Sequence, residues 1–146
     1  MSEVDTAVDL FRNGCACSQA VLAAFGPRFG LDEAAALRVA SGFGSGMRMG
    51  DTCGVVTGAF MVLGLASCRA SCRTADERQP ACDAVTSFAA EFRRRQGALA
   101  CRDLLECDVS VAEGRAEARA RNLFKTRCVD LVRASAELLD ERLGSA

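Results

Sequence analysis

The residues of this chain best suited to chemistry are its cysteines. Nine cysteines occur among 146 residues, and histidine is absent. Without histidine, Ser-His and Cys-His catalysis, histidine metal sites and histidine-ligated haem are all excluded. Sulfur is therefore the expected carrier of any reaction or metal. The cysteines are Cys15, Cys17, Cys53, Cys68, Cys72, Cys82, Cys101, Cys107 and Cys128.

The number and setting of these cysteines indicate how they are used. Their number is odd, and the opening stretch MSEVDTAVDLF is acidic and has no apolar signal core. In a chain without an export signal, this favours reduced thiols, metal ligation or redox chemistry over a complete set of disulfides. We therefore expect a cytoplasmic protein.

The charge of the chain argues against several classes of partner. The net charge is -1 and the sequence pI is about 5.5, so no global field attracts nucleic acid or an anionic membrane. The basic stretch at 114–127 is interrupted by Glu117, and aromatic residues for base stacking are scarce. The apolar run at 55–66 is shorter than the roughly 20 residues that a membrane span needs. We expect neither nucleic-acid binding nor membrane insertion.

A glycine-rich stretch, GFGSGMRMGDTCG at 42–54, leads into this apolar run. It fails the dinucleotide-binding pattern because Met47 or Met49 occupies the third glycine position, and the chain has no Gly-Lys pair for a P-loop. The freedom of glycine instead suits a loop that folds closely over a buried site. The expected site loop comprises Gly44, Gly46 and Gly50, followed by Gly54 and Gly58, which would let a neighbouring helix approach.

Cys53 follows the loop, at the start of the apolar run. In the first turn of a helix, free backbone N–H groups and the macrodipole lower the pKa of a thiol, which favours a thiolate for metal binding or attack on disulfides. A second interpretation is that Cys53 is an ordinary buried cysteine, since unpaired cysteine is among the most buried residue types. The local sequence leaves both interpretations open.

Helices must position these cysteines, because apolar residues recur at a helical period nearly throughout the chain. The pattern predicts one or two helices over 3–26, with a possible break at Asn13-Gly14. Further helices are expected over 31–41, 55–66, 81–97 with a continuation at 99–105, and 114–143. Residues 74–80 are expected to form a loop, and no alternating strand pattern occurs. The chain is expected to be one domain over 1–146, an all-α bundle of about five helices with the glycine-rich loop before its central helix.

The last of these segments places a cysteine near the core. Phe124, Cys128, Leu131, Ser135 and Leu138 follow one another at steps of three or four residues, so they share one helix face. Cys128 is therefore expected on or beside the buried stripe of that helix.

Four segments of the chain resemble a known family. They are GCACSQAVL at 14–22, CGVVTGAFMVLGL at 53–65, CRDLL at 101–105 and the single Cys128. In this order they resemble the redox-active family named for its C_GCAxxG_C_C pattern. Two positions depart from the family pattern: Val55 stands where the family has alanine, and Ala16 where it usually has asparagine.

The resemblance implies a small helical domain with a redox role, in which Cys17, Cys53, Cys101 and Cys128 form one site. Helical periodicity alone does not choose between Cys15 and Cys17. None of the local cysteine pairs typical of zinc ribbons, ferredoxins or thioredoxin-like proteins occurs among the four. Only the tertiary structure can therefore gather them.

Four thiolates suit zinc or an iron–sulfur cluster, and a redox role favours iron because zinc has no redox chemistry. We expect an iron–sulfur cluster for electron transfer, with 2Fe–2S favoured over 4Fe–4S, a redox partner protein and a homodimer. Two alternatives stay open. One is a metal-free protein that exchanges thiols and disulfides, with Cys53 as the attacking group. The other is a binding module that zinc stabilises.

Five cysteines lie outside this set as accessory thiols. Cys68 and Cys72 are four residues apart, with Cys82 ten residues further on; on a helix the first two would share a face and could form a bridge or bind metal as a second site. Cys15 and Cys107 could serve as stand-in ligands or resolving thiols, although such neighbours are more often small core residues.

Overall fold

The computed structural model describes residues 1–68 and 70–144 and is helical. Within these residues the only β-pairing is an isolated bridge between Thr52 and Ala100. The all-α class is thus confirmed, but the described part of the chain holds eight α-helices, more than the expected number of about five. They are α1 (Glu3–Arg12), α2 (Cys17–Phe25), α3 (Glu33–Val39), α4 (Gly54–Ser67), α5 (Ala75–Gln96), α6 (Cys101–Leu105), α7 (Ala112–Ala120) and α8 (Arg127–Leu143), joined in part by short turns η1 (Gly26–Phe29), η2 (Gly46–Gly50) and η3 (Leu123–Lys125).

Two of the expected helical segments are broken in the structure. The segment 3–26 divides at Asn13 and Gly14, where Gly14 has a φ of 112°, into α1 and α2. The segment 114–143 was expected to be continuous, and this is wrong. It breaks at Asn122, which has a φ of 58°, and resumes as α8 after η3. Asparagine adopts this left-handed conformation more readily than most residues. Because no glycine or proline stands at this position, the sequence did not indicate a break in the helix.

α5 begins earlier than the sequence predicts. The stretch 74–80 was expected to be a loop, yet α5 starts at Ala75 and contains Pro80. The hydroxyl of Thr74 accepts a hydrogen bond from the backbone N–H of Glu77 at 3.1 Å, and Asp76 and Glu77 place negative charge in the first turn. This cap and the helix macrodipole stabilise the first turn of α5. Pro80 made the same stretch look like a loop in the sequence.

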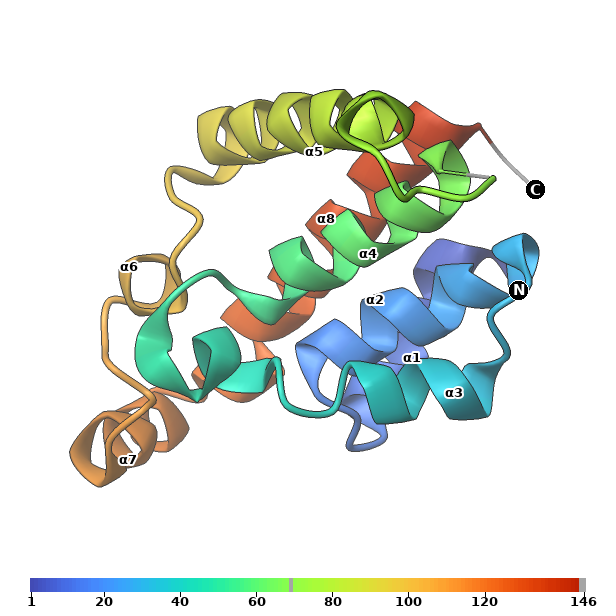
Figure 1. Cartoon of the computed structure of the whole chain (residues 1–146). Helices are drawn as coiled ribbons and strands as arrows, with labels where there is room; N and C mark the ends of the chain where they lie inside the picture. The colour runs from blue at the N-terminus through green and yellow to red at the C-terminus, as the bar shows by residue number, and fades with distance from the viewer. Residues whose placement is uncertain (69, 145–146) are drawn as a thin grey trace.

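α2 and α4 lie side by side at the centre of the molecule (Figure 1). α2 packs against α1, α3, α4 and α8, and α4 packs against α5 and α8 as well. Both buried polar side chains at this centre form hydrogen bonds: Ser18 donates to the carbonyl of Ala40 at 2.9 Å, and Ser135 donates to the carbonyl of Val55 at 2.7 Å. The largest fully buried side chains are Phe25, Phe88, Phe92, Leu22, Leu131, Leu138 and Leu139.

Two glycines let α2 and α4 approach closely, as the sequence predicts. A Cβ atom on Gly54 would lie 2.5 Å from the Sγ of Cys17, and one on Gly58 would lie 2.9 Å from the carbonyl oxygen of Ser18. Such distances are shorter than real carbon contacts. The glycines of the CGxxxG segment are therefore required by the contact between these two helices.

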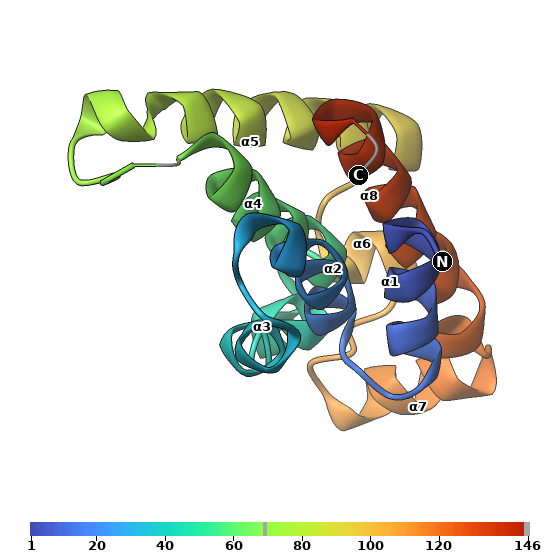
Figure 2. The same ribbon diagram turned by 90° about the vertical axis from the view of Figure 1, so that its right-hand side faces the viewer.

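The view turned by 90° shows the first turns of α5 reaching beyond the rest of the bundle (Figure 2). Residues 70–74, which lead into α5, lie at this projecting end. In the part of the chain that the structure describes, no helix has both the length and the apolar character of a membrane span.

A candidate four-cysteine site

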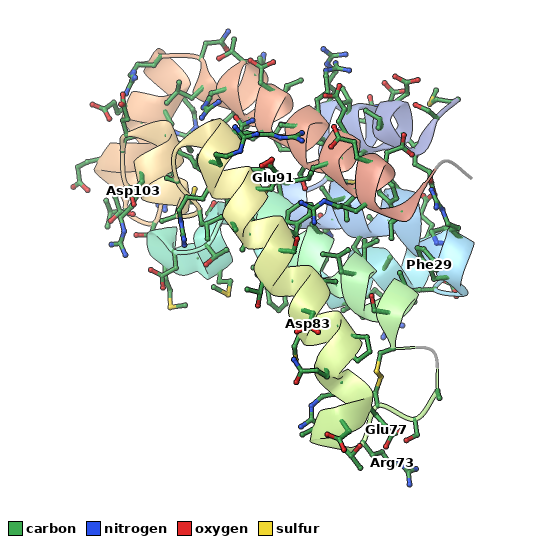
Figure 3. All side chains as sticks on the ribbon, turned by 90° about the horizontal axis from the view of Figure 1, so that it is seen from above. Phe29, Arg73, Glu77, Asp83, Glu91 and Asp103 are labelled. Atoms are coloured by element: carbon green, nitrogen blue, oxygen red, sulfur yellow. A yellow bond between two sulfur atoms is a disulfide. The ribbon has the colours of Figure 1, made fainter. Side chains whose placement is uncertain are left out.

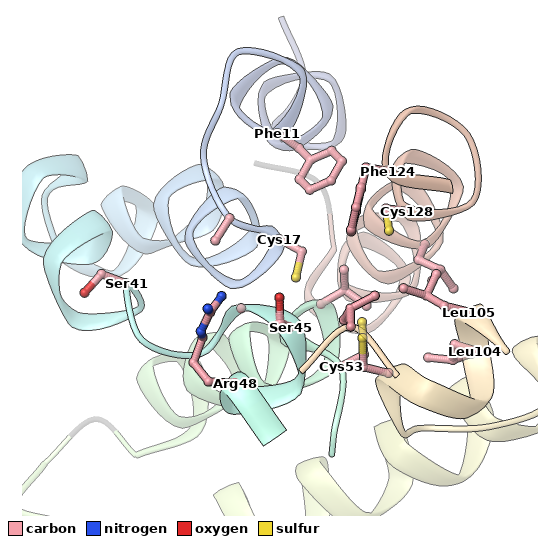
Figure 4. A pocket seen from close by; sticks show the side chains of 16 residues that line it. Phe11, Cys17, Ser41, Ser45, Arg48, Cys53, Leu104, Leu105, Phe124 and Cys128 are labelled. Carbon is pink, nitrogen blue, oxygen red and sulfur yellow. The ribbon is translucent and has the colours of Figure 1, made fainter. Parts of the chain in front are cut away.

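One cavity gathers the four cysteines that the sequence indicates as a site. It has a volume of about 180 Å³, and Cys17, Cys53, Cys101 and Cys128 all line it. Figure 4 shows the labelled sulfurs of Cys17, Cys53 and Cys128 around this space. Most of the remaining lining is apolar and includes Phe11, Val55, Leu104, Leu105, Val109, Phe124 and Leu131. Residues far apart in the sequence thus share one nonpolar environment.

Each of these cysteines lies at the start of a helix. Cys17 and Cys101 are the first residues of α2 and α6, Cys53 directly precedes α4, and Cys128 is the second residue of α8. The free N–H groups and macrodipoles of the longer helices α2, α4 and α8 stabilise negative charge near their first turns. These helix starts favour a thiolate, whereas burial among apolar side chains opposes one. The sequence predicts this position only for Cys53.

Backbone hydrogen bonds place Cys53 and Cys101 beside each other. The N–H of Cys53 donates to the carbonyl of Leu99 at 2.8 Å, and the N–H of Cys101 donates to the carbonyl of Asp51 at 2.6 Å. These two bonds flank the antiparallel bridge between Thr52 and Ala100. A pairing this short has no periodic signal in the sequence, so sequence reasoning missed it.

The thiols of Cys17 and Cys53 interact with each other. The thiol of Cys53 donates a hydrogen bond to the sulfur of Cys17, and this bond lowers the pKa of Cys17 against the opposing effect of burial. The backbone N–H groups of Ser18 and Gly54 lower the pKa of Cys17 further. Cys17 is therefore the first of the four to lose its proton as the pH rises.

Of the two interpretations of Cys53, the structure favours the buried, neutral cysteine over the thiolate. Its hydrogen bond to Cys17 raises its pKa well above the usual value, and burial raises it further. Cys53 is only 6% exposed. The free N–H of Gly54, at the start of α4, acts on the sulfur of Cys17 rather than on the residue that precedes it.

The other two thiols of the cavity are held in their neutral form. Burial raises the pKa of Cys101 to about 12 and that of Cys128 to about 12, and negative charge on Cys17 contributes to both shifts. An apolar environment disfavours the thiolate because it removes the water that solvates the charge. The metal-free site thus favours one thiolate and three protonated thiols.

The glycine-rich loop lies against the cavity. Gly44, Ser45 and Arg48 line it, and Arg48 is the one charged residue among those lining residues. Figure 4 shows the side chains of Arg48 and Ser45 on the same side as Cys17.

Two glycines shape the turn η2 within this loop. Gly46 and Gly50 have φ values of 62° and 70°. A Cβ on Gly46 would lie 2.5 Å from the backbone nitrogen of Asp51, so the turn closes too tightly for another residue. The expectation of a loop folded over a buried site agrees with this geometry.

The five accessory cysteines do not line this cavity. Cys15 and Cys107 are half-buried; burial and a hydrogen bond with Glu117 raise the pKa of Cys107. Cys68 and Cys72 form a disulfide, one of the two outcomes that their spacing allows, but Cys72 lies outside any helix. Cys82 is an exposed free thiol on α5.

The four sulfurs are not arranged as ready-made metal ligands. Over residues 1–68 and 70–144, no group of three or more histidine, cysteine, aspartate or glutamate side chains is positioned to hold a metal ion. The residue types nevertheless fit a sulfur-ligated metal, because four thiols share the cavity and no carboxylate lines it.

Comparison with known proteins places this arrangement in a family. A family model described as "Putative redox-active protein (C_GCAxxG_C_C)" matches residues 15–142. No curated protein and no solved structure matches the chain. The match begins just before Cys17 and extends beyond Cys128, so it includes all four cysteines of the cavity. The chain belongs to the C_GCAxxG_C_C family of redox-active proteins.

Proposed function

We propose that this protein transfers electrons through an iron–sulfur cluster held by Cys17, Cys53, Cys101 and Cys128. The observation that carries the proposal is the single apolar cavity that all four cysteines line. Bound there, the cluster would supply a site that accepts and releases one electron. A 2Fe–2S cluster is favoured, since four cysteines suffice for it.

The chemistry of the lining supports iron in a sulfur environment. Soft thiolates bind iron–sulfur clusters and zinc in preference to calcium or magnesium, and a redox-active family favours iron over zinc. Binding requires the protons of Cys53, Cys101 and Cys128 to leave. Their raised pKa values therefore make cluster affinity depend on pH, as is usual for cysteine-bound metals.

The protein would stabilise and shield the charge of such a centre. The starts of α2, α4 and α8 direct the positive ends of their dipoles toward the cysteine sulfurs, and Arg48 adds a full positive charge. The leucine, valine and phenylalanine lining limits the access of water. A redox partner protein, a homodimer and a cytoplasmic location remain predictions.

Anaerobic purification followed by analysis of iron, sulfide and zinc and a visible spectrum tests this proposal. We expect iron and sulfide in matching amounts and a coloured protein. Replacing any of Cys17, Cys53, Cys101 or Cys128 by serine should remove most of the cluster, since each supplies one of four ligands. Cys15→Ser is the matched control, because Cys15 lies two residues from Cys17 but does not line the cavity. A folded, colourless, metal-free wild-type protein would contradict the proposal.

A specific contact favours a second candidate function, thiol–disulfide exchange by Cys17 and Cys53. Their sulfurs are hydrogen-bonded, Cys17 is the more exposed, and Cys53 is buried. The Cys17 thiolate would attack a substrate disulfide, forming a mixed disulfide and releasing one substrate thiol. Cys53 would then attack Cys17, lose its proton and release the second substrate thiol. The protein would end with a Cys17–Cys53 disulfide, and two electrons would pass to the substrate.

The two candidates differ in their need for Cys101 and Cys128. Cluster binding needs all four cysteines, whereas exchange needs only Cys17 and Cys53. Reduction of a model disulfide by Cys101→Ser and Cys128→Ser proteins separates the two functions. Exchange retained at the wild-type rate, with no iron in the wild-type protein, would favour the second candidate.

A further inference from the structure

A second group of cysteines lies at the other end of α4. Cys53 precedes this helix and Cys68 follows it; with 14 residues at 1.5 Å each, the two ends are about 20 Å apart. Cys68 forms a disulfide with Cys72, and their Cα atoms are 5.8 Å apart, within the usual range for a bridge. Figure 3 shows this bond at the projecting end of α5, near the labelled Glu77 and Arg73.

A third sulfur shares the surroundings of this disulfide. Cys68, Cys72 and Cys82 all line one open surface cavity of about 560 Å³. Cys82 is a free, exposed thiol on α5. Apolar side chains of α4 and α5, including Phe60, Leu65 and Val85, form much of the remaining wall. Among the described residues that line it, Arg78 is the only charged one. The cavity therefore combines a disulfide, a thiol and access from solvent.

Two local features favour opening of the disulfide. Cys72 has a φ of 54°, a left-handed conformation that costs a non-glycine residue on the order of 1 kcal/mol or more. Opening the bridge releases Cys72 from the constraint that ties it to Cys68. The sulfur of Cys68 also lies 3.6 Å from the carbonyl oxygen of Glu77, an acceptor ready for the thiol proton that appears on reduction. Strained or exposed disulfides are typically the ones that exchange.

We propose that Cys68, Cys72 and Cys82 form a second redox site, which exchanges two electrons with thiol reductants and acts independently of the four-cysteine cavity. A reductant thiolate attacks one sulfur of the Cys68–Cys72 bridge, the S–S bond breaks, and the leaving cysteine takes up a proton. A second reductant thiol then attacks the mixed disulfide. The reductant leaves as a disulfide, and the protein has gained two electrons and two protons.

Cys82 gives this site a second reaction. Its thiolate attacks the bridge, forms a new disulfide with Cys68 or Cys72, and displaces the other as a thiolate, with no net transfer of electrons. The positive charge of Arg78 in the same cavity favours the thiolate that leaves. The bridge therefore moves between two positions, which a purely structural disulfide does not do.

Alkylation with iodoacetamide and peptide mapping test the site on the full-length native protein. Aliquots are equilibrated either with glutathione buffers of graded redox ratio or with reduced thioredoxin, then trapped. We expect Cys68 and Cys72 to resist alkylation before reduction and to react after it. Opening by glutathione identifies a small thiol as a sufficient reductant, and opening by thioredoxin alone identifies a protein dithiol. We also expect partial reduction to trap a bridge that includes Cys82.

Three variants make the result decisive. Cys82→Ser should lose the rearranged bridge but keep the Cys68–Cys72 bridge, and Cys15→Ser should behave as wild type in both respects. Cys17→Ser, which disables the other cavity, should leave exchange at the second site unchanged, so failure of one proposal is distinguishable from failure of the other. The proposal is overturned if Cys68 and Cys72 alkylate without reduction, if neither reductant opens their bridge in the folded protein, or if no bridge to Cys82 forms.

Discussion

At the scale of the residue, a hydrogen bond between two thiols separates the pKa values of Cys17 and Cys53. Cys53 donates to Cys17, so the pKa of Cys17 is lowered and that of Cys53 is raised. The two thiols thus have opposite roles although both lie at the start of a helix. Helix position alone does not decide which cysteine is nucleophilic; the direction of the hydrogen bond decides it.

Removing this hydrogen bond should make Cys17 less reactive. In the metal-free protein, Cys53→Ala deletes the donor, so the pKa of Cys17 should rise and its alkylation rate at neutral pH should fall. The measurement is the rate of iodoacetamide labelling of Cys17 as a function of pH, followed by mass spectrometry. Cys15→Ala serves as the control and should leave the Cys17 profile in place. An unchanged profile in Cys53→Ala would show that the contact between the sulfurs does not act as described.

At the scale of the element, the contact between α2 and α4 fixes where the sulfurs meet. Gly54 is covered by the sulfur of Cys17, the backbone nitrogen of Ser18 and the carbonyl of Phe43. Gly64, further along α4, has no atom within 4 Å of the place where its Cβ would be. The same substitution at these two positions of one helix therefore separates packing from helix propensity.

Gly54→Ala should destabilise the protein and Gly64→Ala should not. The added methyl group at Gly54 overlaps Cys17 and forces the helices apart, at a cost of about 1–3 kcal/mol. At Gly64 alanine should stabilise the helix by roughly 0.5–1 kcal/mol. Urea unfolding measures both values. Equal effects of the two changes would be incompatible with the close approach at Gly54.

At the scale of the whole molecule, burial of neutral thiols links stability to pH. The pKa values of Cys101 and Cys128 are raised to about 12, so their contribution to stability is complete below the unfolded thiol pKa. It is lost as the pH rises toward 12, because the unfolded chain then releases protons that the folded chain retains. The chain contains no tyrosine and a single lysine, Lys125, so the other free cysteines are the main groups that titrate in the same range.

The metal-free protein should therefore lose stability between about pH 9 and pH 12. The double variant Cys101→Ala/Cys128→Ala should show a smaller loss over this interval. Leu105→Ala, which removes another buried side chain of the cavity, should lower stability equally at both ends of the interval. Urea unfolding at a series of pH values makes the comparison. A double variant with the wild-type pH dependence would contradict the burial of neutral thiols.

The sequence by itself determined the helical class, the central helix and the identity of the chemistry. Apolar residues recur at a helical period wherever one face of a helix is buried, so the helices can be predicted from the sequence. The absence of histidine leaves cysteine sulfur as the group that carries any reaction or metal. The sequence also predicted that Gly54 and Gly58 allow a neighbouring helix to approach closely. The continuous helix over 114–143 and the loop at 74–80 were mispredicted because the left-handed Asn122 and the capped turn at Thr74 depend on local geometry rather than on periodicity.

The resemblance to the family indicates which four cysteines form the site, but only the tertiary structure decided how they meet and which of them carries charge. Cys17, Cys53, Cys101 and Cys128 meet because four helix starts converge and because the Thr52–Ala100 bridge aligns two segments. Neither feature has a periodic signal, since both depend on contacts between residues distant in the chain. The pKa values of these thiols likewise depend on tertiary contacts. Burial and one hydrogen bond make Cys17, rather than Cys53, the favoured thiolate.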